Sequence, residues 1–293
     1  MLRLIEHPGH DAFLRVRPAS RAVVSWNTAA PAGTLSLTAH RTDATTSKPL
    51  PYVRWSPSER RSLDGADPTT RIAVDIVRSD VPIAAIGVAS SVALDAVAVS
   101  VPPANEARAR EPTATATLDV PPLSQYLAAY PKERGWCSAA SLAMLLQFHG
   151  VSADVPTVAS AVYDASYEGT GNWSFNAAYA GARGLRSVIA HLRGIGHVAA
   201  FIDAGLPLAI SISWTSGQLP GAPLEHSDGH LLVVRGIGAT HVAVNDPAHP
   251  SVATRYPRAA LDALFRAAGG VAYLIAPPSR TAELVALANG DDG

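Results

Sequence analysis

The chain has 293 residues, of which 48% are hydrophobic and only 16% are charged, so it can bury a sizeable core and is not disordered. Lys and Arg number 23 against 24 Asp and Glu, and this balance argues against a global field that recruits nucleic acid or an anionic membrane. A single cysteine excludes an internal disulfide framework and a cysteine-rich metal site.

The N-terminal residues show no basic segment leading into an apolar run of about 7–15 residues, so no secretory signal is expected. The longest apolar stretches, 81–88 and 92–101, are interrupted by Pro, Ser or Asp well before the ~18 residues of a membrane helix. We therefore expect no membrane association and, by default, a cytoplasmic location.

The first hundred residues carry short runs of β-branched and apolar residues separated by turn residues such as Pro31-Ala32-Gly33. This spacing is typical of a sandwich, and it predicts an all-β, sandwich-like accessory domain over 1–101. The expected strands are 13–16, 22–26, 34–39, 71–77, 81–89 and 93–101. In the run 71–77, Ile72, Val74 and Ile76 alternate onto one face.

Residues 102–119 begin with Pro102-Pro103 and continue with charges and a Thr/Ala alternation, which indicates a linker. After it, helical patterns precede strand patterns, so residues 120–278 are predicted to form an α+β domain with an antiparallel sheet. The expected helices are 138–149, 156–163, 174–183, 197–204 and 258–267, and the expected strands are 207–214, 230–237, 241–245 and 270–275. Residues 279–293 are left as a C-terminal tail.

Cys137 stands directly before the predicted helix 138–149. A cysteine at a helix N-terminus faces free backbone N–H groups and the positive end of the helix dipole, which favour the thiolate. Cys137 is therefore a candidate nucleophile, and the alternative is an inert buried thiol.

A nucleophilic cysteine needs a base, and His230 opens an apolar strand after Gly229. The strands 231–237 and 241–245 are joined by a hairpin-length turn, Gly238-Ala239-Thr240, so antiparallel pairing brings Asp246 back to the end that carries His230. Asp246 is thus expected to orient the imidazole, with Asn245 as the alternative.

An acyl-transfer site also needs a group that stabilises the oxyanion. The Gln125 amide, together with the backbone N–H of Cys137, could hold the oxyanion of an acyl-transfer reaction.

His226, Asp228 and His230 cluster in sequence, but no fourth ligand stands at a recognisable spacing for zinc. We expect no metal and no cofactor.

Four blocks of the sequence together resemble the C39-like cysteine peptidases, relatives of the bacteriocin-processing peptidase domains in the papain-like superfamily. The blocks are 120–126 with VP and SQ, 135–144 with WCS before an apolar helix, 228–237 with DGH before an apolar strand, and 244–248 with VNDP. The segment 255–277 is similar to the closing helix and strand of the family, so the resemblance covers about 120–277.

The resemblance implies a papain-like fold in which Cys137 is the nucleophile, His230 the base, Asp246 the orienting residue and Gln125 the oxyanion donor. It implies a peptide or protein substrate and would allow a secreted location, and it implies no oligomeric state. Transfer of the acyl group to an amine with the same residues, as in transglutaminase-like enzymes, and a non-catalytic peptide-binding module are the alternatives.

Overall fold

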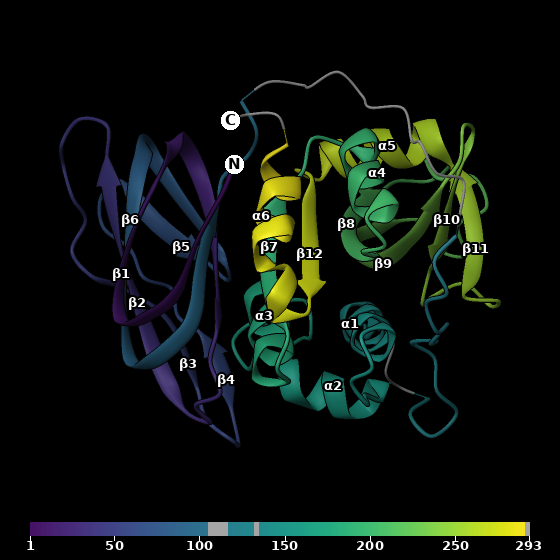
Figure 1. The fold of residues 1–293 in the computed structure, drawn as a ribbon, viewed down its shortest axis with the longest axis horizontal. Helices are drawn as coiled ribbons and strands as arrows, with labels where there is room; N and C mark the ends of the chain where they lie inside the picture. Colours follow the sequence, from purple (N-terminus) through teal and green to yellow (C-terminus); the bar gives the residue numbers. More distant parts are fainter. Residues whose placement is uncertain (105–116, 132–134, 291–293) are drawn as a thin grey trace. The chain divides into compact units, whose positions relative to one another are not determined.

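The computed structural model describes residues 1–104, 117–131 and 135–290 (Figure 1). Most of the expected linker, 105–116, lies outside the described residues. The chain divides into two compact units, Met1–Pro102 with Val162–His191 and Ala276–Gly293, and Pro103–Ala161 with Leu192–Ile275. This grouping differs from the expected ranges 1–101, 120–278 and 279–293, because residues 162–191 and 276–293 group with the first hundred residues.

The first unit is built on an antiparallel sheet with strand order β1-β6-β2-β3-β4, and β5 also pairs with β6. Its strands are β1 (Leu2–Asn27), β2 (Gly33–Arg41), β3 (Leu50–Trp55), β4 (Arg60–Ser62), β5 (Thr70–Ala73) and β6 (Ile76–Ser100). β1 and β6 are long, with 26 and 25 residues, and each contains two of the strands that the sequence predicts separately. Figure 1 shows how strongly these two strands curve.

Both ends of β1 pair with the same segment of β6. Leu2 lies opposite Ser100 on one side, and Val23 lies opposite Ser100 on the other. The pairing forms one continuous hydrogen-bonded sheet that folds back on itself. The structure therefore shows the expected all-β character, but it does not confirm a sandwich of two separate sheets.

The prediction of one strand over 71–77 is wrong. A tight turn at Val74 and Asp75 separates β5 from β6, and Ala73 pairs directly with Ile76. Val74 adopts a positive φ of 59°, which reverses the chain. A strict alternation of apolar residues cannot reveal such a turn, because both arms of the hairpin continue the same pattern.

The first unit also contains segments from later in the chain, namely α3 (Trp173–Ala182), β7 (Arg186–His191), the 3-10 turn Pro278–Arg280 and α6 (Thr281–Asn289). Buried hydrogen bonds connect them to the sheet: the hydroxyls of Tyr52 and Ser174 lie 2.8 Å apart, and Asn27 Nδ2 donates to the Ser187 carbonyl at 2.9 Å. The expected C-terminal tail is thus mostly helix.

The second unit has the predicted α+β organisation, with helices followed by an antiparallel sheet in the order β11-β10-β9-β8-β12. Its elements are α1 (Cys137–Phe148), most of α2 (Val155–Val162), α4 (Ile195–Asp203), β8 (Leu208–Trp214), β9 (Ser227–Ile237), β10 (His241–Asn245), β11 (Ala253–Pro257), α5 (Arg258–Ala267) and β12 (Val271–Ala276). The five helices expected from sequence periodicity are all present within a residue or two. The periodicity did not reveal β7 and β11, nor β3 and β4 of the first unit.

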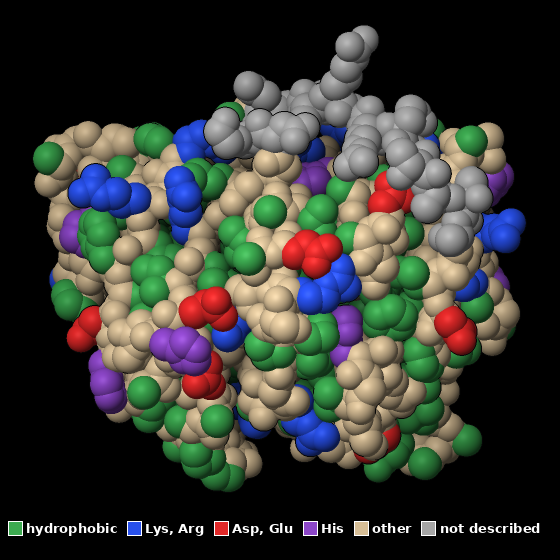
Figure 2. All heavy atoms as spheres, in the orientation of Figure 1, with side chains coloured by type: hydrophobic (Ala, Val, Ile, Leu, Met, Phe, Trp, Pro, Cys, Tyr) green, Lys and Arg blue, Asp and Glu red, His purple; other side chains and the backbone are tan. Residues whose placement is uncertain are grey.

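Helix α1 is the central helix of this unit and packs against β8 and β9. Residues 138–146 of the helix are all buried, as expected for a helix that is apolar on every side. In the described part of the chain no helix is both long and apolar enough to cross a membrane. Basic and acidic side chains are interspersed on the face shown in Figure 2.

Candidate active site

Cys137 is the first residue of α1 and is half-buried. The residue before it, Trp136, occupies the N-cap position without making a side-chain cap hydrogen bond. The start of the helix therefore lacks a side-chain cap, and the thiol accepts a hydrogen bond from the backbone N–H of Ser138. The helix start thus supplies the electropositive surroundings expected for this cysteine.

His230 lies on β9, flanked by β8 on one side and β10 on the other, and only 2% of its surface is exposed. Its Nε2 lies 2.7 Å from Oδ1 of Asp246, and its side chain is also hydrogen-bonded to the Cys137 thiol. The Trp214 ring of β8 meets the imidazole edge to face, with centroids 5.6 Å apart. The imidazole therefore bridges the thiol and the carboxylate.

The β9–β10 hairpin brings Asp246 to His230, as the residue count predicted. The turn closes with Gly238 N–H donating to the His241 carbonyl at 2.8 Å, and a register shift between Ala243 and Val244 adds a bulge. Asp246 follows directly after β10 and is fully buried. Its Oδ1 also accepts the Ala248 N–H at 2.9 Å, which fixes the carboxylate.

The electrostatics favour a charged thiol–imidazole pair. Burial by itself raises the pKa of Cys137, but the hydrogen bond and the positive charge of His230 outweigh it and hold the pKa below its usual value. Burial by itself lowers the pKa of His230, but the hydrogen bonds to Asp246 and Cys137 outweigh it and raise the pKa to about 10. Burial opposes ionisation of Asp246, yet its bond to His230 keeps the pKa of this carboxyl low.

Gln125 and Asn245 connect the 120–126 segment to the same end of the sheet. Gln125 is 3% exposed, and its backbone N–H donates to the Pro247 carbonyl at 3.0 Å. Asn245 Nδ2 donates to the Val120 carbonyl at 2.9 Å. Asn245 therefore fixes this segment, whereas Asp246 is the side chain bonded to His230.

Tyr256 is a site residue that the sequence did not indicate. It lies on β11, is fully buried, and donates its phenolic hydroxyl to Oδ2 of Asp246 at 2.6 Å. Burial and the neighbouring carboxylate both raise the pKa of this phenol, so it stays a donor. Tyr256 lies ten residues after Asp246, on the strand β11 that pairs with β10. Recognising β11 in the sequence would have placed Tyr256 near Asp246.

A zinc site needs three or four His, Cys, Asp or Glu side chains gathered in space, and the structure describes residues 1–104, 117–131 and 135–290. No group of three or more His, Cys, Asp and Glu side chains there could hold an ion. His226, Asp228 and His230 form no such group. His230 instead has Cys137 and Asp246 as its partners.

A thiol at a helix start, an imidazole hydrogen-bonded to it and a carboxylate on the far ring nitrogen form the arrangement of cysteine-dependent acyl-transfer enzymes. The family model described as "Peptidase_C39 like family" matches residues 117–273. The match spans more than half of the chain, so this chain belongs to that family. The resemblance noted from the four sequence blocks is thereby confirmed.

The solved structures that are similar to this chain are described as peptidases or proteases, and each is less than 20% identical to it. One, from Bacillus anthracis, is described as a C39-like peptidase; it is 18% identical, with a TM-score of 0.42 over 55% of this chain and 96% of that one. A double glycine motif protease from an AMS/PCAT transporter, in complex with the leader peptide, is 19% identical, with a TM-score of 0.39 over 57% and 97%. The peptidase domain of Streptococcus ComA, a bi-functional ABC transporter, is 17% identical, with a TM-score of 0.37 over 53% and 98%. No curated protein matches the chain.

Proposed function

We propose that the protein is a cysteine peptidase or amidase that hydrolyses a peptide or amide bond in a peptide or protein substrate. The observation that carries the proposal is the continuous hydrogen-bonded chain from the Cys137 thiol through His230 to Asp246. Family membership supports the peptidase class. In this proposal residues 120–278 adopt the papain-like arrangement, and residues 1–101 form an accessory domain.

In the resting enzyme Cys137 and His230 form a thiolate–imidazolium pair. Three features support this charge state: the helix start at Cys137, the bridging hydrogen bonds of His230, and the buried carboxylate of Asp246. The pair makes Cys137 nucleophilic at neutral pH without a separate deprotonation step.

The thiolate sulfur attacks the substrate carbonyl carbon and forms a tetrahedral intermediate. The Cys137 backbone N–H and the Gln125 amide stabilise its oxyanion, and the burial of Gln125 beside the Pro247 backbone supports a fixed position for this residue. The imidazolium of His230 then gives its proton to the leaving amine, and the carbon–nitrogen bond breaks. Water gives a proton to the neutral imidazole as it attacks the thioester carbonyl, the thiolate leaves with the carbon–sulfur bond electrons, and the thiolate–imidazolium pair is restored.

Asp246 keeps the imidazole in the ring orientation that presents the other nitrogen to Cys137. Its bond to Nε2 supports this role, because the remaining Nδ1 is then the atom that faces the sulfur. The Ala248 N–H and the Tyr256 hydroxyl hold the carboxylate in turn. Tyr256 is thus a positioning residue that acts through Asp246.

A digest of a peptide library tests the proposal, with the wild type compared against Cys137→Ala and His230→Ala. Both variants should lose turnover almost completely and keep the fold, because the two residues act as one unit. His241→Ala is the matched control, since His241 is an exposed histidine at the opposite end of the same hairpin. Retention of most of the wild-type kcat/KM in His230→Ala would contradict the assigned base.

Two further measurements separate the alternatives. Adding a competing amine to the digest distinguishes hydrolysis from acyl transfer, because the amine appears in the product only in the second case. Alkylation of Cys137 by iodoacetamide at about pH 6 distinguishes an enzyme from a binding module, since an unperturbed thiol with a pKa of about 8.5 reacts very slowly there.

A further inference from the structure

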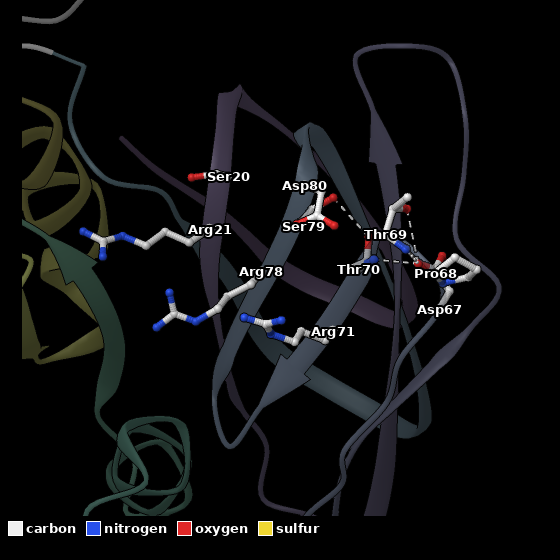
Figure 3. Close-up of a pocket in the computed structure, with 10 residues that line it drawn as sticks. All are labelled: Ser20, Arg21, Asp67, Pro68, Thr69, Thr70, Arg71, Arg78, Ser79 and Asp80. Atoms are coloured by element: carbon white, nitrogen blue, oxygen red, sulfur yellow. Dashed lines mark hydrogen bonds between the residues drawn. The ribbon is translucent and has the colours of Figure 1, made fainter.

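Three arginine side chains form a row across neighbouring strands of the first unit. Arg78 of β6 lies opposite Arg21 of β1 on one side and opposite Arg71 of β5 on the other. Directly opposed residues project to the same face of a sheet with Cβ atoms about 5 Å apart. Figure 3 shows the three side chains extending in the same direction from their strands. We call these residues the arginine row.

Folding does not explain the arginine row. Like charges directly opposite one another destabilise a sheet. In the described residues none of the three arginines forms an ion pair, whereas Arg41 and Arg186 of the same unit do. Arg71 and Arg78 are exposed, and Arg21 is half-buried. The repulsion within the row is therefore left without a compensating carboxylate.

The arginine row borders a cavity of about 270 Å³ whose other lining residues are mostly Ser, Thr and Asp (Figure 3). The other lining residues are Ser20, Asp67, Pro68, Thr69, Thr70, Ser79 and Asp80. Asp67 is bound by Arg41 at 2.5 Å and accepts the N–H groups of Thr69 and Thr70, so its charge is already neutralised. Asp80 is the one remaining acidic lining residue, and the cavity keeps an excess of positive charge.

We propose that this cavity is a binding site for a small ligand with two or more linked phosphate groups, of the diphosphate or triphosphate class. Guanidinium groups bind phosphate oxygens in a forked, bidentate manner, and each of the three can engage a different phosphate oxygen pair. Three adjacent strands place the row over roughly 10 Å, which is longer than one tetrahedral oxyanion. The cavity volume lies near the lower end of the range for small-molecule sites, roughly 300 Å³, so it fits a small molecule. The site is distinct from the proposed peptidase chemistry, which uses residues of the second unit.

Titration calorimetry of the full chain with inorganic pyrophosphate at low salt tests the proposal. We expect saturable binding of one pyrophosphate with a Kd below about 1 mM. Arg78→Gln removes the centre of the row and should weaken binding by about tenfold or more, as expected for loss of charge-assisted hydrogen bonds. Arg15→Gln is the matched control, because Arg15 is an exposed arginine on β1 outside the cavity, and it should bind as the wild type does.

Two variants make the test independent of a folding defect. Asp80→Asn removes the remaining negative charge and should tighten pyrophosphate binding by a few-fold. Arg78→Gln should leave the melting temperature of the free protein unchanged or raised, because it removes repulsion. If Arg78→Gln does not fold, Arg71→Gln at the exposed end of the row takes its place with the same expected loss of affinity.

Sulfate distinguishes a site for linked phosphates from general attraction of anions. Sulfate carries fewer negative charges than pyrophosphate, and all of them lie on one tetrahedral centre, so it should bind about tenfold more weakly, a difference of about 1.4 kcal/mol. Equal affinities for sulfate and pyrophosphate would overturn the proposal. The absence of saturable binding, or an equal loss of affinity in Arg15→Gln and Arg78→Gln, would also overturn it.

Discussion

The hydroxyl of Tyr256 donates to Oδ2 of Asp246 at 2.6 Å, while the other carboxylate oxygen bonds to His230. Both oxygens of this fully buried carboxylate are thus occupied from different strands of the sheet. The bond from β11 restrains Asp246 on the side that faces away from the imidazole. A residue with no contact to the thiol can therefore influence how the imidazole is held.

Replacing Tyr256 by Phe should lower kcat/KM by about 5- to 50-fold and leave KM nearly unchanged. Hydrogen bonds to a charged group contribute roughly 1.5–3 kcal/mol, and part of that loss is recovered as the carboxylate relaxes. Steady-state kinetics measures the effect, with the exposed Tyr163→Phe as the matched control. A lower melting temperature with unchanged kcat/KM would show that Tyr256 serves the fold alone.

The sequence predicted the nearness of His230 and Asp246, because a hairpin turn of known length fixes the register of two short strands. It did not predict the contact of Tyr256, because the turn residues around His249 and Pro250 conceal the short strand that follows. The long strand β1 was missed for a related reason. Pro8, Gly9 and Pro18 look like turns, but here they stand at register shifts inside one continuous strand.

Asp246→Asn should reduce kcat/KM by about 10²- to 10⁴-fold, less than the nearly complete loss in Cys137→Ala. The thiolate–imidazolium pair forms without Asp246, so the carboxylate mainly orients the ring and sustains its charge. Asn245→Ala is the paired variant, because Asn245 bonds to the Val120 carbonyl and not to His230. If Asn245→Ala were as damaging as Cys137→Ala while Asp246→Ala stayed near the wild type, the orienting residue would have to be reassigned to Asn245.

The pH profile of kcat/KM should be flat across neutral pH. The acidic limb follows the Cys137 thiol, whose pKa lies below its ordinary value, and the alkaline limb follows His230, whose pKa is raised to about 10. Asp246→Asn removes a carboxylate that raises the His230 pKa, so the alkaline limb should move to lower pH. A narrow optimum in the wild type, or an alkaline limb that does not move in the variant, would contradict the ion-pair state.

Asp75 should make the protein less stable as the pH rises from about 4 to 7. Burial raises the pKa of this carboxyl to about 7, above the value of about 3.9 in an unfolded chain. The folded state therefore binds the extra proton between these values, and stability is lost as the pH rises through that window, by at most about 1.4 kcal/mol per pH unit. Melting temperatures of Asp75→Asn should vary less between pH 5 and 7.5, because the amide keeps an oxygen for the Trp173 N–H and does not titrate. An identical pH dependence in the wild type and the variant would assign the effect to other groups.

Deleting residues 1–101 tests which segments fold alone. Ser174 and Ser187 are buried, and the deletion removes their partners Tyr52 and Asn27. Each unpaired buried polar group costs roughly 1–3 kcal/mol, so the truncated protein should melt at a clearly lower temperature than the full chain or should aggregate. Tyr52→Phe in the full chain removes one of these bonds without exposing the sheet, and it should show a smaller decrease. A truncated protein that keeps both its melting temperature and the reactivity of Cys137 would instead support the simpler division, in which 1–101 and 120–278 are independent domains.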